Sequence, residues 1–214
     1  VPQDSDDPPA SQLLKEIEVE KRRLVKEGAI KPPRRAPEIK EVEIPYLLPL
    51  GWKWVRIRGI CHDWGQKIPS GRFTYIDVGS INNKSGVIGQ EVQTLEAHEA
   101  PSRARIIVRE GTIIYSTVRP YLLNIAIMEG EYEYEPIVST AFAILHTFAG
   151  INNRFIYSYL RSPVFIKYVE SKMKGVAYPA INDGDFFLGI LPLPSLPEQH
   201  RIVAKIDELM ALCN

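Results

Sequence analysis

The stretch 191–213, LPLPSLPEQHRIVAKIDELMALC, restricts the fold more than any other part of the chain. It opens with leucines that alternate with prolines, at Leu191, Pro192, Leu193, Pro194, Leu196 and Pro197. Because proline fixes φ and has no N–H to donate, we expect this segment to be extended and unable to sit inside a sheet. Ser195 and Glu198 match a capping box, which predicts a helix with Ser195 as N-cap and the Glu198 carboxylate reaching back to it.

Apolar residues recur along this C-terminal helix at spacings of four, three and four, at Ile202, Ile206, Leu209 and Cys213. Such a narrow apolar seam is suited to packing against another helix. A helix that only covers its own domain would show the same pattern, so this alternative remains open.

A second, highly charged helix is predicted near the N-terminus. Asp7 and the proline after it fit the N-cap and first helical position, and Gly28 fits the position just past the last turn. Its few apolar residues include Leu13, Ile17 and Leu24, so the helix would be marginal alone and needs a surface to cover. We predict that this stripe pairs with the C-terminal seam, within the chain or between two copies.

A proline-rich linker, 31–50, separates the first helix from a globular part. Apolar or alternating runs bounded by turn residues predict strands at 52–57, 74–78, 105–108, 112–115, 122–128, 137–145 and 186–191. Residues 90–101 show no clear period. A helix is predicted over 153–173, kinked or split at Pro163. The run 129–135, EGEYEYE, predicts an acidic hairpin tip.

Composition fits a globular protein and gives no sign of a nucleic-acid surface by itself. The 214 residues are 45% hydrophobic, and 26 basic residues balance 26 acidic ones. Two distant cysteines, Cys61 and Cys213, favour a reducing, cytoplasmic setting. No signal peptide and no apolar run of about 18 residues is present, which predicts no membrane span. Because the chain starts at Val1 and its helical pattern is unbroken at the other end, we expect a fragment.

The sequence has no pattern typical of a catalytic site. It lacks a G-x-x-x-x-G-K-[ST] loop, a dinucleotide fingerprint, a G-x-S-x-G elbow and the Asn-Pro-Pro-aromatic signature of amino-methyltransferases. The histidines are scattered without the spacing of metal ligands: His62, His98, His146 and His200. We therefore expect neither catalytic residues nor a metal site on this chain.

Several segments together resemble the specificity subunits of type I restriction-modification enzymes. PLPSLPEQHRIVAKIDELMALC is similar to the junction between a target recognition domain and the following spacer helix, and VPQDSDDPPASQLLKEIEVEKRRLVKEG to the approach to such a domain. LPLGWKWVRI, TVRPYLLNIAI and VSTAFAIL also resemble this family, and the pieces follow the family's order. The resemblance covers nearly the whole chain and implies a fragment with one target recognition domain and flanking spacer-helix segments.

With the strand and helix pattern, the resemblance implies an α+β fold. We expect a mixed, mostly antiparallel twisted sheet with a few helices, flanked by long charged helices of coiled-coil type. The expected divisions are an N-terminal charged helix segment (1–30), the linker (31–50), a target recognition domain (51–194) and the start of a spacer helix (195–214).

The function that the resemblance implies is sequence-specific recognition of double-stranded DNA, one half of a bipartite site, in a bacterial defence system. Such a subunit docks modification subunits, which methylate adenine with S-adenosylmethionine, and a motor-nuclease subunit, which uses ATP and Mg²⁺. This chain would itself hold no cofactor and catalyse no reaction. A second recognition domain or a second copy would attach through the helices. Two alternatives stay open: a protein-interaction scaffold that does not bind DNA, and a stand-alone nuclease.

Four polar turns combine basic, amide and aromatic side chains, the mixture that proteins use to bind the phosphates and the nucleobase edges of DNA. The candidate DNA-binding residues in them are Lys67, Arg72, Asn82, Asn83, Lys84, Arg119, Tyr121, Lys172, Lys174, Tyr178 and Asn182. Solvated turns favour several of the same residue types, so this alternative also stays open. The acidic run 129–135 is expected to face away from DNA, because phosphates would repel it.

Overall fold

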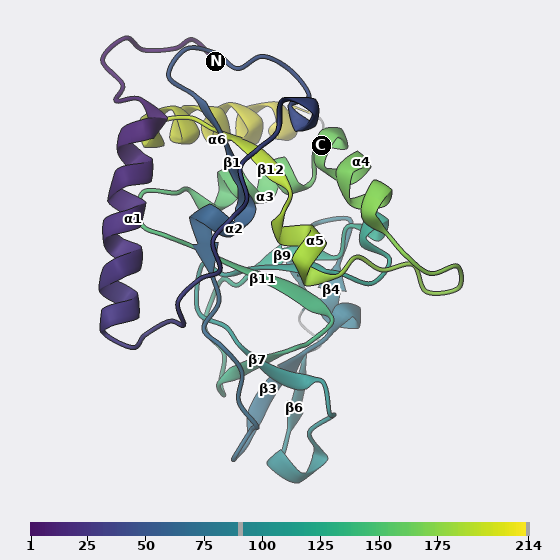
Figure 1. The fold of residues 1–214 in the computed structure, drawn as a ribbon. Helices are drawn as coiled ribbons and strands as arrows, with labels where there is room; N and C mark the ends of the chain where they lie inside the picture. Colours follow the sequence, from purple (N-terminus) through teal and green to yellow (C-terminus); the bar gives the residue numbers. More distant parts are fainter. Residues whose placement is uncertain (90–91, 213–214) are drawn as a thin grey trace.

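The computed structural model describes residues 1–89 and 92–212 and shows a mixed α+β fold with mostly antiparallel sheets (Figure 1). The helices are α1 (Ala10–Lys26), α2 (Ile57–Ile60), α3 (Asn153–Leu160), α4 (Pro163–Lys172), α5 (Asp183–Phe187) and α6 (Leu196–Ala211). The strands are β1 (Lys53–Arg56), β2 (Cys61–His62), β3 (Phe73–Ile76), β4 (Ile81–Asn82), β5 (Val87–Ile88), β6 (Gln93–Leu95), β7 (Ala104–Ile107), β8 (Ile113–Ser116), β9 (Ile125–Ile127), β10 (Pro136–Ser139), β11 (Phe142–Thr147) and β12 (Ile190–Leu193). Short 3₁₀ turns occur at η1 (Glu41–Glu43), η2 (Val78–Ser80), η3 (Ala97–Glu99) and η4 (Pro120–Leu122).

Two four-stranded sheets form the middle of the molecule. One has the strand order β2-β11-β8-β9 and is antiparallel throughout. The other has the order β6-β3-β10-β7, in which β3 and β10 run parallel. Strands β1 and β12 form a separate antiparallel ribbon, and β4 and β5 form a short hairpin.

The first of these sheets is covered on both faces. In β8, Ile113 and Tyr115 face the main core with the helices, whereas Ile114 faces a second core shared with the other sheet. Because side chains alternate along a strand, this pattern places the sheet in the middle of three layers. Figure 1 shows the helices above and the layer with β3, β6 and β7 below.

The strand predicted at 74–78 is β3. The alternation of Ile76 and Val78 with more polar residues predicts a strand with one buried face, and this expectation is wrong. All four residues of β3 are buried, because Phe73 and Tyr75 pack in a third cluster on the far face while Ile76 packs between the sheets. An alternating sequence pattern identifies only the more apolar face of a strand, so it does not predict whether the other face is also buried.

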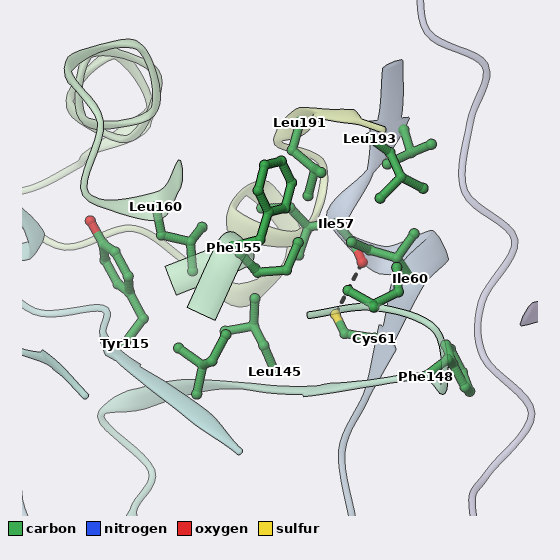
Figure 2. Close-up of a cluster of buried hydrophobic side chains, with 14 of the residues drawn as sticks. Ile57, Ile60, Cys61, Tyr115, Leu145, Phe148, Phe155, Leu160, Leu191 and Leu193 are labelled. Carbon is green, nitrogen blue, oxygen red and sulfur yellow. Dashed lines mark hydrogen bonds between the residues drawn. The ribbon is translucent and has the colours of Figure 1, made fainter. Parts of the chain in front are cut away.

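The main core joins the ends of the chain to the central sheet (Figure 2). Tyr115 from β8, Phe155 from α3 and Leu191 from β12 belong to one group of buried side chains, in which Tyr115 lies beside Leu160. Each such fully buried side chain contributes about 1.5–3 kcal/mol of transfer free energy. The Cys61 thiol donates to the carbonyl of Ile57 at 3.0 Å, and burial raises its pKa, so it acts as a packing residue.

The apolar stripe of α1 is used within its own domain. Leu13, Ile17 and Leu24 are 7%, 1% and 8% exposed and belong to the main core. The Glu20 carboxylate accepts a hydrogen bond from the backbone N–H of Ala149 at 2.7 Å. The surface that this helix needs is therefore supplied by the globular domain.

Helix α6 packs against α3, and its Val203 belongs to the same buried core as the α1 stripe. The pairing of the α1 stripe with the α6 seam stays a prediction. Ile202 contacts the main core, Ile206 is half-buried, Leu209 is exposed, and Cys213 lies outside the described residues. Pairing between two copies stays a prediction. In the described part of the chain, no helix has both the length and the apolar character needed to cross a membrane.

The start of α6 binds the N-terminal segment. Ser195 caps the helix as predicted: its Oγ accepts from the N–H of Glu198 at 3.2 Å and donates to Asp7 at 3.0 Å. The Glu198 carboxylate does not reach back but accepts from Trp52 Nε1 at 2.9 Å. Asp7 is not the N-cap of α1, which is Pro9. The Asp7 carboxylate instead accepts hydrogen bonds from the Arg201 guanidinium, and this contact holds the pKa of the Asp7 carboxyl below its usual value.

Some predicted strands differ from the observed ones. The proline-rich segment does enter a sheet, since Pro192 lies opposite Trp54 in the β1–β12 ribbon, where each strand has one free edge. The strand predicted at 186–191 begins only at Ile190, after α5, and β6 was missed. The run 137–145 is two strands, β10 and β11. The split at Pro163 is confirmed, with Ser162 capping α4.

The proline-rich linker is fixed to the domain by one buried arginine. Arg56 is 7% exposed and binds both oxygens of Glu43 at 2.7 Å. It also donates to the backbone carbonyls of Pro37, Glu38 and Leu188. The Arg56 guanidinium lowers the pKa of Glu43 to about 2. The linker at 37–43 is therefore held against β1.

We predict that Glu43→Gln lowers the free energy of unfolding at pH 7 by about 1–2 kcal/mol. This is less than a fully buried pair would lose, because the Glu43 side chain is 35% exposed. Since the folded-state pKa lies below the ordinary 4.5, the stabilisation is complete above 4.5 and is lost as pH falls toward 2. Urea unfolding across this range should show the two proteins converging in acid. Glu41→Gln, an exposed neighbour, is the control; a gap that persists at pH 2 contradicts the prediction.

Candidate nucleic-acid interface

Two turns that are distant in the sequence are joined by a short backbone ladder. Val118 and Ala180 form an antiparallel bridge. On either side, the N–H of Arg119 donates to Pro179 at 2.8 Å and the N–H of Ile181 donates to Thr117 at 3.0 Å. Because 117 directly follows β8, the ladder fixes both turns to the buried central sheet.

The second of these turns, 174–180, is a closed hairpin. Lys174 and Ala180 exchange both of their backbone hydrogen bonds, each at 2.9 Å. Gly175 has a φ of +92°, and a Cβ there would lie 3.0 Å from the Tyr178 carbonyl oxygen, so the turn requires glycine. Figure 1 shows this turn as the green loop that extends outward beyond α4.

A third turn, 82–85, lies against the first. Asn82 Oδ1 accepts from the backbone N–H groups of Lys84 and Ser85 at 3.1 and 3.2 Å and so shapes the turn. Asn83 Nδ2 donates to the Leu122 carbonyl at 3.0 Å. We refer to the turns 82–85, 119–123 and 174–180, with Lys172 at the end of α4, as the three-turn surface.

The three-turn surface is positively charged although the chain is neutral overall. Its exposed cations are Lys84, Arg119, Lys172 and Lys174. The segments 82–85, 119–123 and 172–180 contain no Asp or Glu. The Arg119 guanidinium lies 5.4 Å from the centre of the Tyr178 ring, which is 74% exposed, and Tyr121 is 40% exposed. Cations beside exposed aromatic rings suit a polyanion that carries flat bases.

Arg119 adopts a backbone conformation that non-glycine residues rarely take. Its φ is 46° and ψ is 53°, and Leu123 is also left-handed, with a φ of 55°. Each such residue costs roughly 1–2 kcal/mol, which the ladder must offset. Strain of this kind concentrates at functional sites, and here it sets the direction of an exposed arginine.

The predicted DNA-binding turn that contains Lys67 and Arg72 is not part of the three-turn surface. Lys67 is paired with Glu135, and Arg72 donates to Glu96 at 2.6 Å and to the Tyr134 hydroxyl at 3.3 Å. The backbone N–H of Lys67 also donates to the carbonyl of Arg105 in β7. These two predicted DNA-binding residues therefore lie against the acidic run 129–135, which was expected to face away from DNA.

All three predicted amides have structural hydrogen bonds. Asn182 caps α5, with its Oδ1 accepting from the N–H of Asp185 at 2.9 Å, whereas Asn82 and Asn83 make the contacts described above. Next to Asn182, the Tyr168 hydroxyl donates to the Asp185 carbonyl, and burial raises the pKa of Tyr168 to about 12. Sequence reasoning missed Val176, which is fully exposed at the tip of the hairpin. The prediction for this loop rested on its polar residues alone, although Val176 lies between Gly175 and Pro179 in the sequence.

A hollow of about 730 Å³ lies beside the three-turn surface, between 84–89, the acidic run, α3 and α6. Its charged lining is mixed, with Lys84, Arg154, Arg161, Glu129, Glu131 and Asp207. Carboxylates on one wall would repel phosphates, so the three-turn surface is the better candidate for a duplex.

A further group of titratable side chains lies in an aromatic cluster near β2 and β11. The rings of His62 and His146 lie 5.1 Å apart, and the Arg109 guanidinium lies 3.7 Å from the centre of the Trp64 ring. Burial lowers the pKa of His146 to about 4, so this ring is neutral at physiological pH. Within residues 1–89 and 92–212, no three His, Cys, Asp or Glu side chains are grouped to hold a metal ion.

Comparison with known proteins gives consistent matches. Residues 49–214 match the family model described as the type I restriction modification DNA specificity domain. The type I restriction enzyme EcoAI specificity subunit of Escherichia coli is 32% identical over 224 residues, which cover 100% of this chain and 38% of that protein. The chain thus spans well under half the length of this relative.

Solved structures share the fold. The HsdS subunit from Thermoanaerobacter tengcongensis superimposes with a TM-score of 0.72 at 36% identity, over 80% of this chain and 45% of that one. A chain from a structure described as the basis of complex assembly and conformational transition of the type I R-M system gives 0.71 at 37% identity, over 78% and 44%. The matched part is again less than half of each solved chain.

We predict that the left-handed backbone at Arg119 determines which replacements the fold accepts. Arg119→Asn should change the free energy of unfolding by less than about 0.5 kcal/mol, because Asn adopts this conformation readily. Arg119→Val should lose about 1–2 kcal/mol, because a β-branched side chain does not. Urea unfolding of both variants tests this. Equal stabilities would show that the backbone at 119 is not held in this conformation.

Proposed function

The chain belongs to the family of type I restriction modification DNA specificity domains, and on this premise we propose that its three-turn surface reads a short sequence of double-stranded DNA. One observation carries the proposal: four exposed cations and two exposed tyrosines lie on turns and on the end of α4, in segments without a carboxylate that are held against a buried sheet. Surfaces with this composition bind phosphates and base edges together.

The residues divide into two roles. Lys84, Lys172 and Lys174 are suited to phosphates, because a flexible ammonium group binds as a point charge. Arg119 is suited to a guanine edge, since its planar guanidinium can donate two parallel hydrogen bonds to O6 and N7. Its stacking against Tyr178 and the fixed backbone of its turn limit the orientations it can adopt. Little side-chain entropy is then lost on binding.

The finer parts of the proposal concern the whole assembly. We propose that 51–194 is the recognition domain, that it reads one half of a bipartite site, and that 1–30 and 195–214 set its distance from the other half. In this proposal modification and motor-nuclease subunits supply the chemistry, with S-adenosylmethionine, ATP and Mg²⁺ bound to them. This chain contributes recognition only.

A scaffold that binds proteins instead of DNA is the second candidate, and exposed apolar residues favour it. On the linker, Val42, Leu47 and Leu50 are 89%, 95% and 92% exposed, and Leu212 near the end of α6 is 78% exposed. Exposed apolar side chains that form a patch are typical of contact with another protein, and three of these lie within nine residues of the linker. Because they lie outside the three-turn surface, we assign them to docking of the partner subunits, alongside DNA recognition.

We predict that the chain binds a selected duplex with a strong dependence on salt. Duplexes selected from a random library give the sequence, and log K is then measured against log [salt]. Lys172→Ala and Lys174→Ala should each weaken binding and reduce the steepness of this plot by about 0.9, because each removes one phosphate contact. Lys53→Ala, an exposed lysine on β1, is the matched control and should change neither value.

The same titration separates the two candidates. A protein scaffold would show no preferred duplex. Equal losses for Lys53→Ala and Lys174→Ala would contradict the assignment to the three-turn surface.

A further inference from the structure

The tip of the hairpin 174–180 is apolar, although cations surround it. Val176 is 102% exposed, and Tyr178 is 74% exposed. Lys174 and Lys172 lie at the base of the hairpin and Arg119 lies beside Tyr178. Because Val176 is fully exposed, its side chain packs against nothing in the described part of the chain and is free to contact a partner.

The charges around the tip indicate what it would meet. With phosphates bound by the lysines at its base, the tip of the hairpin would point between the two strands of a duplex, into a groove. The major groove is about 12 Å wide and displays one apolar group, the C5 methyl of thymine. The minor groove displays no methyl group, and apolar side chains that enter it are usually wedges that separate base steps.

The side chains at the tip favour the major groove. Val176 has only two methyl groups beyond Cβ, which is short for a wedge. The larger Tyr178 ring lies beside the Arg119 guanidinium, and the next residue, Pro179, is bound to the Arg119 backbone, which limits how far the ring could insert between bases. A short branched side chain instead suits contact with a methyl group that projects toward it.

We propose that Val176 is a specificity-determining residue that reads the C5 methyl group of a thymine in the major groove of the target. This inference rests on the proposed function and adds the chemical group that is recognised. Arg119, held next to the same tip, then contacts a neighbouring base pair or phosphate. The recognised half-site therefore contains a thymine at the position below the hairpin.

The test replaces each thymine of the selected half-site, one at a time, with deoxyuridine, which lacks only the methyl group. At one position the affinity should fall roughly fourfold, as expected for loss of one buried methyl group. Val176→Ala should weaken binding to the thymine duplex by a similar factor and should make the deoxyuridine substitution silent. Because Val176 is fully exposed, this variant should keep the stability of the parent chain.

Lys84→Ala serves as the control. It should weaken binding to the thymine and deoxyuridine duplexes equally and should keep the fourfold difference between them. A chain that binds its selected duplex but tolerates deoxyuridine everywhere overturns this inference and leaves the proposed function standing. A half-site without thymine in either strand, or a penalty that persists in Val176→Ala, overturns it as well. A chain that binds no duplex overturns both proposals.

Discussion

The backbone hydrogen bonds between 117–119 and 179–181 are the constraint on which the candidate site depends. They join a turn after β8 to a hairpin after α4 and anchor both to the central sheet, which is buried on both faces. Without them, Arg119 would lose the contacts that hold its left-handed backbone, and Tyr178 would lose its neighbour. The rigidity of the surface therefore comes from main-chain geometry, and its chemistry comes from side chains that the fold leaves exposed.

This division explains how a chain with no net charge can present a surface for a polyanion. The three turns contain no carboxylate, and some carboxylates elsewhere are paired with cations, as Glu135 is with Lys67 and Glu96 with Arg72. The local field is then set by cations within a few ångströms of a bound phosphate. Charges farther away are screened over about 8–10 Å at physiological salt.

Local rules predicted the parts of the fold that local chemistry decides. The cap at Ser195, the end of α1 before Gly28 and the split at Pro163 were all predicted from neighbouring residues. The packing partners that are distant in the sequence were not predicted. The stripe of α1 was predicted to need cover, but an apolar stripe does not specify its partner, and the domain itself covers it.

The same limit applies to the site. Lys67 was predicted to bind DNA because it is a cation in a polar turn, and the sequence does not indicate its partner Glu135, which lies 68 positions away. The convergence of three of the four candidate turns depends on a backbone ladder and on the hydrogen bond from Asn83 to Leu122, and no sequence periodicity indicates either of them. Val176 was missed because an apolar residue is usually expected to be buried. Its exposure follows only from the hairpin 174–180, which projects from the surface.

Photo-crosslinking would test most directly whether the three turns form one DNA-reading surface. Duplexes that carry 5-iododeoxyuridine at single positions would be irradiated with the chain, and the attached peptides would be identified by mass spectrometry. Crosslinks should map to 172–182 and 117–123, where Tyr178 and Tyr121 are exposed, at adjacent positions of one half-site. Crosslinks confined to the linker at 31–35 or to the acidic run 129–135 would contradict the proposed surface.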